Sequence, residues 1–138
     1  MSEVVLADTG PLVAILNQSD QHHKQSIEAL KTLRLPLLTC WPVLTEAAYL
    51  LRQYPDAVAK LLEGLQSGFL ELLPLDESDA SAIRGILSTY RDQGYQLADA
   101  SLMHLAERED IATVFTLDRR DFDVYRPQAF AALRLLPE

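Results

Sequence analysis

Short apolar runs alternate with amphipathic segments of helical length along this chain, and that alternation restricts the folds open to it. The runs at residues 4–7, 35–39, 69–73 and 113–116 have the length and β-branched content of buried strands, and residues 130–136 could form a last strand. Helices are predicted for residues 11–16, 19–33, 42–54, 55–68 and 78–91, and for the segment that begins at Leu97. Strands that alternate with helices predict an α/β domain whose mostly parallel sheet is covered on both faces.

The composition is that of one ordinary domain. The chain has 138 residues, 49% of them apolar, with no repeat or linker that would divide residues 1–138. No apolar run is long enough to span a membrane, and the N-terminus lacks the pattern of a secretory signal. The single cysteine, Cys40, excludes an internal disulfide and lies in an apolar segment, so we expect a small core residue in a cytoplasmic protein.

The net charge of −8 argues against a general nucleic-acid binder, because phosphates are repelled by such a surface. It does not exclude an enzyme whose acids are neutralised by divalent cations. Three acids have positions that suit such an enzyme. Asp8 follows the first strand, Asp118 follows the strand at residues 113–116, and Asp99 lies in the first turn of the helix between them. In parallel sheets the functional crevice lies outside the carboxyl ends of the strands, so these acids are expected to meet there.

Glu46 is a fourth candidate. It is the only charged residue between Pro42 and Leu51, where apolar residues cover almost the whole circumference of the predicted helix. That pattern is typical of a buried helix, in which a carboxylate is costly without a cation or hydrogen bonds. A solvated position for Glu46 is the alternative.

Carboxylates that converge on one crevice require a positive partner, because like charges raise one another's pKa. Oxygen ligands select Mg²⁺ or Mn²⁺, and no pair of histidines has the spacing of zinc ligands. His22 and His23 are therefore interpreted as surface or supporting residues. For Asp99 the alternative is simple helix capping. A site of three or four acids with a divalent ion suits phosphodiester hydrolysis.

Three arginines near the last acid are candidates to hold substrate phosphates. Arg119 and Arg120 follow Asp118 directly, and Arg126 comes shortly after. A solvated loop is an equally good interpretation of this segment.

Four segments of the chain resemble the acidic motifs of PIN domains. They are VLADTGPLVAIL with Asp8, TEAAYLL with Glu46, LADASLMHLA with Asp99, and TLDRRDF with Asp118. They occur in the family's order and span nearly the whole chain. At this length the chain looks like a stand-alone toxin of the VapC type.

The resemblance implies a Mg²⁺-dependent endoribonuclease with a three-layer fold and strand order 3-2-1-4-5. It also implies an RNA substrate, a homodimer and inhibition by a small antitoxin. By the same carry-over Asp8, Glu46, Asp99 and Asp118 are the catalytic acids, and Asp8, Asp99 and Asp118 bind the metal. By the resemblance, Thr9 and Thr116 match small hydroxyl positions beside the acids. With Arg119, Arg120 and Arg126 they make up the expected substrate-binding residues. Asp20 and His23 stand where many relatives carry an acid and a histidine, but capping explains Asp20 better.

Other functions that use acids at strand ends fit less well. A phospho-acceptor receiver domain needs a lysine after a late strand, and the last lysine here is Lys60. A phosphatase with a nucleophilic aspartate needs a second acid where this chain has Gly10. A catalytically silent PIN-like interaction module, or a PIN nuclease without a toxin role, remains the alternative.

Overall fold

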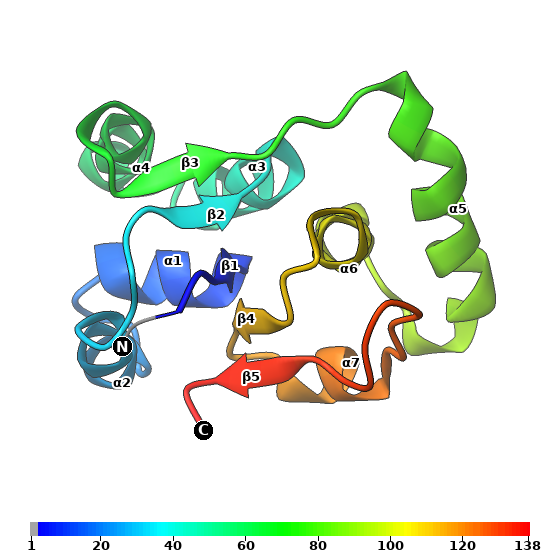
Figure 1. Ribbon diagram of the computed structural model, residues 1–138. Coiled ribbons are helices and arrows are strands. Elements are labelled where there is room, and N and C mark those ends of the chain that lie inside the picture. The colour runs from blue at the N-terminus through cyan, green and yellow to red at the C-terminus, as the bar shows by residue number, and fades with distance from the viewer. Residues whose placement is uncertain (1–2) are drawn as a thin grey trace.

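The computed structural model describes residues 3–138 as five parallel strands flanked by helices (Figure 1). The strands are β1 (Leu6–Ala7), β2 (Leu37–Thr39), β3 (Leu70–Leu72), β4 (Thr113–Phe115) and β5 (Arg134–Leu136). They lie in the order β3-β2-β1-β4-β5, and every neighbouring pair is parallel. This confirms the predicted α/β class and the strand order 3-2-1-4-5.

Seven α-helices connect the strands within residues 3–138. They are α1 (Thr9–Leu16), α2 (His23–Leu30), α3 (Trp41–Leu50), α4 (Pro55–Ser67), α5 (Ala80–Thr89), α6 (Leu97–Glu109) and α7 (Arg119–Val124). Two short 3₁₀ turns, η1 (Glu77–Asp79) and η2 (Arg91–Gln93), flank α5. In Figure 1, α6 lies between the strands and α5, which packs along it on the outside.

The two central strands carry the core. β1 and β4 have no exposed residue, as expected of strands covered on both faces. Cys40 is completely buried beside them, which confirms its predicted place in the core. Phe122 of α7 is also buried and anchors that short helix against the same core.

Local hydrogen bonds explain two helix boundaries that were predicted wrongly. We expected α2 to begin at Ser19, but residues 17–22 form turns because Asn17 and Asp20 accept hydrogen bonds from the backbone two residues later. We expected α3 to continue to Tyr54, yet it ends at Leu50. Residues 51–53 form turns in which the N–H of Arg52 donates to the carbonyl of Tyr49 (3.2 Å) and the N–H of Tyr54 to that of Leu51 (2.7 Å). Pro55 also disfavours a helical conformation at Tyr54. The helix α7 was not predicted at all.

The prediction that α3 is buried all round is also wrong. Its inner face contacts the core through Val43, Leu44 and Ala47. Its outer face leaves three large apolar side chains open to solvent, with exposed fractions of 56% for Trp41, 61% for Tyr49 and 49% for Leu50. No helix within residues 3–138 is both long and apolar enough to cross a membrane.

Two glycines with equal free space should respond in opposite ways to alanine. A methyl group added at Gly68 or at Gly85 would meet no heavy atom within 4 Å. Gly68 ends α4 with φ of +88°, in the left-handed conformation common after a helix, whereas Gly85 lies inside α5. We expect Gly68→Ala to lower the free energy of unfolding by about 1 kcal/mol and Gly85→Ala to raise it by a similar amount. Urea denaturation of the two variants checks this, and an equal effect of both would contradict it.

Candidate active site

An open cleft of about 430 Å³ lies at the carboxyl ends of β1 and β4. All four predicted acids line it: Asp8, Glu46, Asp99 and Asp118. Two further acids, Asp20 and Asp121, line it as well. The structure thus brings together, at one edge of the sheet, acids that are up to 113 residues apart in the sequence.

Asp8 is the most buried of these acids, with only 4% of its surface exposed. It follows β1 and precedes α1, and its backbone N–H donates to the carbonyl of Phe115 on β4 (2.9 Å). The hydroxyl of Thr116 donates to Asp8 Oδ2 (2.8 Å) and accepts from the backbone N–H of Asp118 (2.9 Å). Thr116 therefore holds two of the acids in a fixed relation across the central strand pair.

Asp8 has a strongly raised pKa in this arrangement. Burial raises the pKa of Asp8 from 3.8 to about 7, and the hydrogen bonds from Thr9 and Thr116 offset only part of this effect. The nearby charges of Asp99 and Glu46 raise the pKa further. A cation in the cleft would compensate both the loss of hydration at Asp8 and the repulsion between the acids.

Asp99 serves two purposes at once. Its Oδ2 accepts a hydrogen bond from the backbone N–H of Gln96 (2.9 Å), so it caps the start of α6 as the simpler interpretation expects. It also lines the cleft, and burial followed by the charges of Glu46 and Asp118 raises its pKa. Capping and a place in the acid cluster are therefore compatible.

Glu46 is partly buried and points from α3 into the same cleft. Its Oε1 accepts a hydrogen bond from the hydroxyl of Thr9 (2.9 Å). Thr9 and Thr116 thus each donate to a cleft acid, Glu46 and Asp8 respectively, and both threonines are buried. These bonds suit residues that orient the acids.

Asp121 was missed in the sequence analysis. It lies in the first turn of α7, one turn beyond Asp118, and the hydroxyl of Tyr95 donates to its backbone carbonyl (2.7 Å). Burial raises the pKa of Asp121 to about 6, and the hydrogen bond and charge of Asp118 add to this effect. The spacing of three residues in TLDRRDF was the available signal, but it is informative only if a helix is recognised there.

None of the three predicted arginines lines the cleft. Arg119 turns toward the end of the chain, where its guanidinium donates to the carbonyls of Leu135 (3.3 Å) and Pro137 (2.9 Å). Arg120 is exposed beside Asp121, where its charge lowers the pKa of that acid. Of the three, Arg120 is the one left near the acids with its guanidinium open to solvent.

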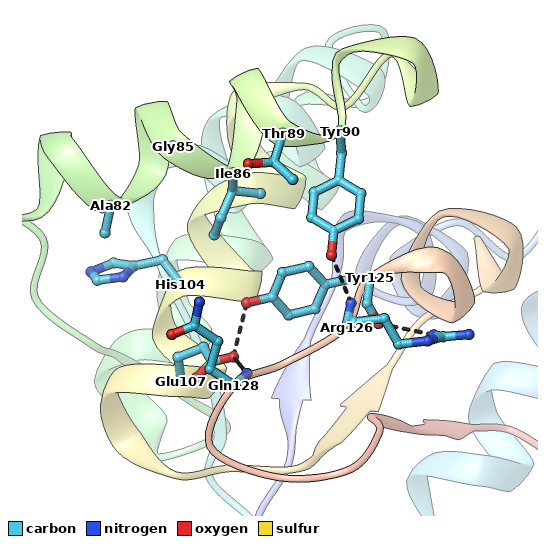
Figure 2. Close-up of a pocket in the computed structure, with 10 residues that line it drawn as sticks. All are labelled: Ala82, Gly85, Ile86, Thr89, Tyr90, His104, Glu107, Tyr125, Arg126 and Gln128. Atoms are coloured by element: carbon cyan, nitrogen blue, oxygen red, sulfur yellow. Dashed lines mark hydrogen bonds between the residues drawn. The ribbon is translucent and has the colours of Figure 1, made fainter.

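Arg126 lines a different cavity, between α5, α6 and the segment after α7 (Figure 2). Its backbone N–H donates to the hydroxyl of Tyr90 (3.0 Å), and its guanidinium donates to the carbonyls of Asp123 and Tyr125. Glu107 closes the other side of this cavity, where it accepts hydrogen bonds from Tyr125 and from backbone N–H groups. These bonds give Arg126 a structural role in the described chain.

The two adjacent histidines have different surroundings. His22 lines the cleft, and its backbone N–H donates to Asp20 Oδ1 (2.8 Å). His23 instead bonds the carbonyl of Ala14 through Nδ1 (2.6 Å) and so joins α2 to α1. His23 is a supporting residue, as interpreted from the sequence, whereas His22 faces the site.

The residues of the cleft fit a hard divalent cation by their chemistry. Within residues 3–138, no group of three or more acid, histidine or cysteine side chains is gathered tightly enough to hold a metal ion. The cleft nevertheless offers the carboxylate oxygens of six acids, and burial together with the neighbouring acids raises the pKa values of Asp8, Asp99 and Asp121. Oxygen donors of this kind suit Mg²⁺ or Mn²⁺.

Comparison with known proteins agrees with this geometry. The family model described as PIN domain matches residues 5–126. The chain belongs to the PIN-domain family. A relative of this PIN domain is "Ribonuclease VapC26" of Mycobacterium tuberculosis (strain ATCC 25618 / H37Rv), which is 29% identical over 135 residues, 96% of this chain and 100% of the relative.

A solved structure shares the fold. It is the crystal structure of Mycobacterium tuberculosis VapC20, described as a toxin that cleaves the sarcin-ricin loop. The TM-score is 0.77 at 16% identity, over 83% of this chain and 90% of the other. The PIN-like fold expected from the acidic motifs is confirmed.

The stability of the metal-free protein should depend on Asp8. The folded state holds the Asp8 proton between about pH 4 and pH 7 because its pKa is raised to about 7, whereas the unfolded chain has released it. Stability should therefore fall as the pH rises through this window. In Asp8→Asn this loss should be smaller, since no proton is exchanged at that position. Melting curves in EDTA at pH 5 and pH 8 check this, and an identical pH dependence in both proteins would refute it.

Asp99→Asn should separate the two purposes of Asp99. Asparagine can still accept the hydrogen bond from Gln96, so the cap is kept while one repelling charge is removed. We expect the metal-free variant to melt at a higher temperature than the parent and to gain less stability from added Mg²⁺. Asp92→Asn, which neutralises an exposed acid outside the cleft, is the matched control. If Asp99→Asn behaves like this control, Asp99 is only a cap.

Proposed function

We propose that this PIN domain is a Mg²⁺- or Mn²⁺-dependent endoribonuclease that hydrolyses RNA phosphodiester bonds. The observation that carries the proposal is the cleft in which four predicted acids and Asp121 converge at the carboxyl ends of the central strands. The name of the relative, a ribonuclease, and the description of the structural neighbour, an RNA-cleaving toxin, support an RNA substrate.

Each acid has a separate part in this proposal. Asp8, Asp99 and Asp118 would hold the cation, which supplies activation of water and neutralisation of phosphate charge when bound. Thr116 keeps Asp8 and the backbone of Asp118 in register through its two hydrogen bonds. Thr9 holds Glu46 toward the cleft, where its carboxylate can accept a proton from the attacking water.

Among the predicted substrate-binding residues, Arg120 is the best candidate for a phosphate contact. It is exposed next to Asp121, whereas Arg119 and Arg126 are engaged with backbone carbonyls. Thr9 and Thr116 act on substrate only through the acids that they orient.

We further propose that the chain is the toxin of a toxin–antitoxin pair and that it forms a homodimer. The similarity to VapC proteins over nearly the full chain supports the toxin role. The dimer is supported by apolar side chains left open at the α3–α4 turn and on α4, where Tyr54 is 48% and Leu62 47% exposed. A nuclease without a toxin role is the alternative that the native operon decides, by the presence or absence of a short antitoxin gene.

The central proposal predicts cleavage that follows the metal. RNA should be cut with Mg²⁺ or Mn²⁺, not with Zn²⁺ alone, and not in EDTA, because the donor set is all oxygen. Asp118→Asn should lose this activity while it remains folded, and Asp92→Asn should keep it. Gel analysis of a labelled RNA after incubation with each protein is the measurement. Undiminished cleavage in EDTA would exclude the metal mechanism, and no cleavage under any condition would favour a silent interaction module.

A further inference from the structure

An open hollow of about 580 Å³ lies next to the acidic cleft, between the outer face of α3 and the start of α6. Its lining is mostly apolar and includes Trp41, Tyr49 and Leu97. Glu46 and Gln96 line both this hollow and the cleft, so the two are continuous. We call it the aromatic hollow.

The aromatic hollow is built by helical spacing. Trp41 and Tyr49 are eight residues apart on α3, with Thr45 midway between them, so all three lie on one face of the helix. Trp41 is 56%, Tyr49 61% and Leu97 57% exposed. Large apolar side chains that gather at the surface in this way mark a binding site more often than a structural need.

Positive charge is present at the edge of the aromatic hollow. The guanidinium carbon of Arg52 lies 4.1 Å from the centre of the Tyr49 ring, and its Nη1 donates to the Tyr49 carbonyl (2.8 Å). Arg52 therefore holds the ring in place and adds a cation–π contact. In a protein of net charge −8, this places one cation beside an aromatic ring that lines the hollow.

We propose that the aromatic hollow binds unpaired bases of the RNA strand whose phosphate lies in the acidic cleft, with Trp41 and Tyr49 as stacking surfaces. The proposal rests on the proposed ribonuclease function. Stacking on aromatic rings accepts any base and needs little positive charge, which suits a protein as acidic as this one. Arg52 then meets the backbone phosphate that follows a stacked base. Because paired bases are already stacked on one another, the site selects single-stranded RNA.

A second copy of the chain is the rival occupant of the aromatic hollow. Glu46 belongs to both cavities, so a protein surface seated on the hollow would also lie across the mouth of the cleft. An RNA strand that lies in the cleft reaches the hollow past Glu46 and Gln96, so one ligand can occupy both. Continuity with the acid cluster therefore favours RNA.

Trp41 makes the test direct, because it is the only tryptophan in the chain. The full-length Glu46→Gln variant, which keeps the three proposed metal ligands and should bind without cutting, is titrated in Mg²⁺ with a dye-labelled oligoadenylate, either single-stranded or paired with oligouridylate. Trp41 emission reports stacking, and anisotropy of the dye reports binding. We expect the single strand to quench Trp41 and the duplex to leave it unchanged.

Variants of Tyr49 then separate stacking from apolar contact. Tyr49→Leu should weaken binding of the single strand about ten-fold, the loss expected for one stacked base, whereas Tyr49→Phe should keep it. Leu35→Ala is the control. Leu35 is 51% exposed, but it precedes β2 and so lies at the amino ends of the strands, away from the cleft at their carboxyl ends.

Each outcome has one meaning. RNA that binds by anisotropy without changing Trp41 emission, or equal affinities of Tyr49→Leu and Tyr49→Phe, overturns the aromatic site and leaves the ribonuclease proposal intact. Trp41 emission that shifts with protein concentration but not with RNA assigns the hollow to a second copy and also overturns it. No binding of either RNA overturns both proposals.

Discussion

Asp8 is a carboxylate buried at the end of the central strand, and the site depends on how the fold tolerates it. Only a sheet in which β4 lies beside β1 brings Thr116 within 2.8 Å of Asp8. That one hydroxyl also fixes the backbone of Asp118, so the strand order determines the relation between two acids that are distant in sequence. This hydrogen bond compensates only part of the free energy lost when the carboxylate is removed from water. The pKa of Asp8 therefore stays above its usual value. Without a cation, the buried and mutually repelling acids of the cleft therefore destabilise the folded domain.

Much of this arrangement follows from sequence patterns. The alternation of short apolar runs with helical segments indicates a parallel sheet, and acids at the ends of strands then fall at one edge for geometric reasons. Asp8, Asp99 and Asp118 were found in this way, and all three line the cleft with Glu46. The strand order came from the resemblance to PIN domains, because local periodicity does not say which strands are neighbours.

The rest depended on contacts that no local pattern encodes. The helix α7 has six residues and is held by the burial of Phe122 and by the bond from Tyr95, so Asp121 on its first turn was not recognised. The arginines around it were indistinguishable in sequence, yet Arg119 bonds carbonyls near the C-terminus while Arg120 remains free of such bonds. The apolar residues of α3 alone predict that its outer face is buried. Only the packing of the other helices shows that no part of the described chain covers this face.

The same charges that prepare the site for a cation limit how it can bind RNA. Neither lysine nor arginine is among the residues that line the cleft. Affinity cannot come mainly from counterion release, because that requires several lysine or arginine contacts with phosphates. In the proposed ribonuclease, the affinity would come from the divalent ion and from contacts that do not depend on charge. An acidic cleft continuous with exposed aromatic side chains suits both, since an ion held by the acids would neutralise a phosphate while the bases stack beside it.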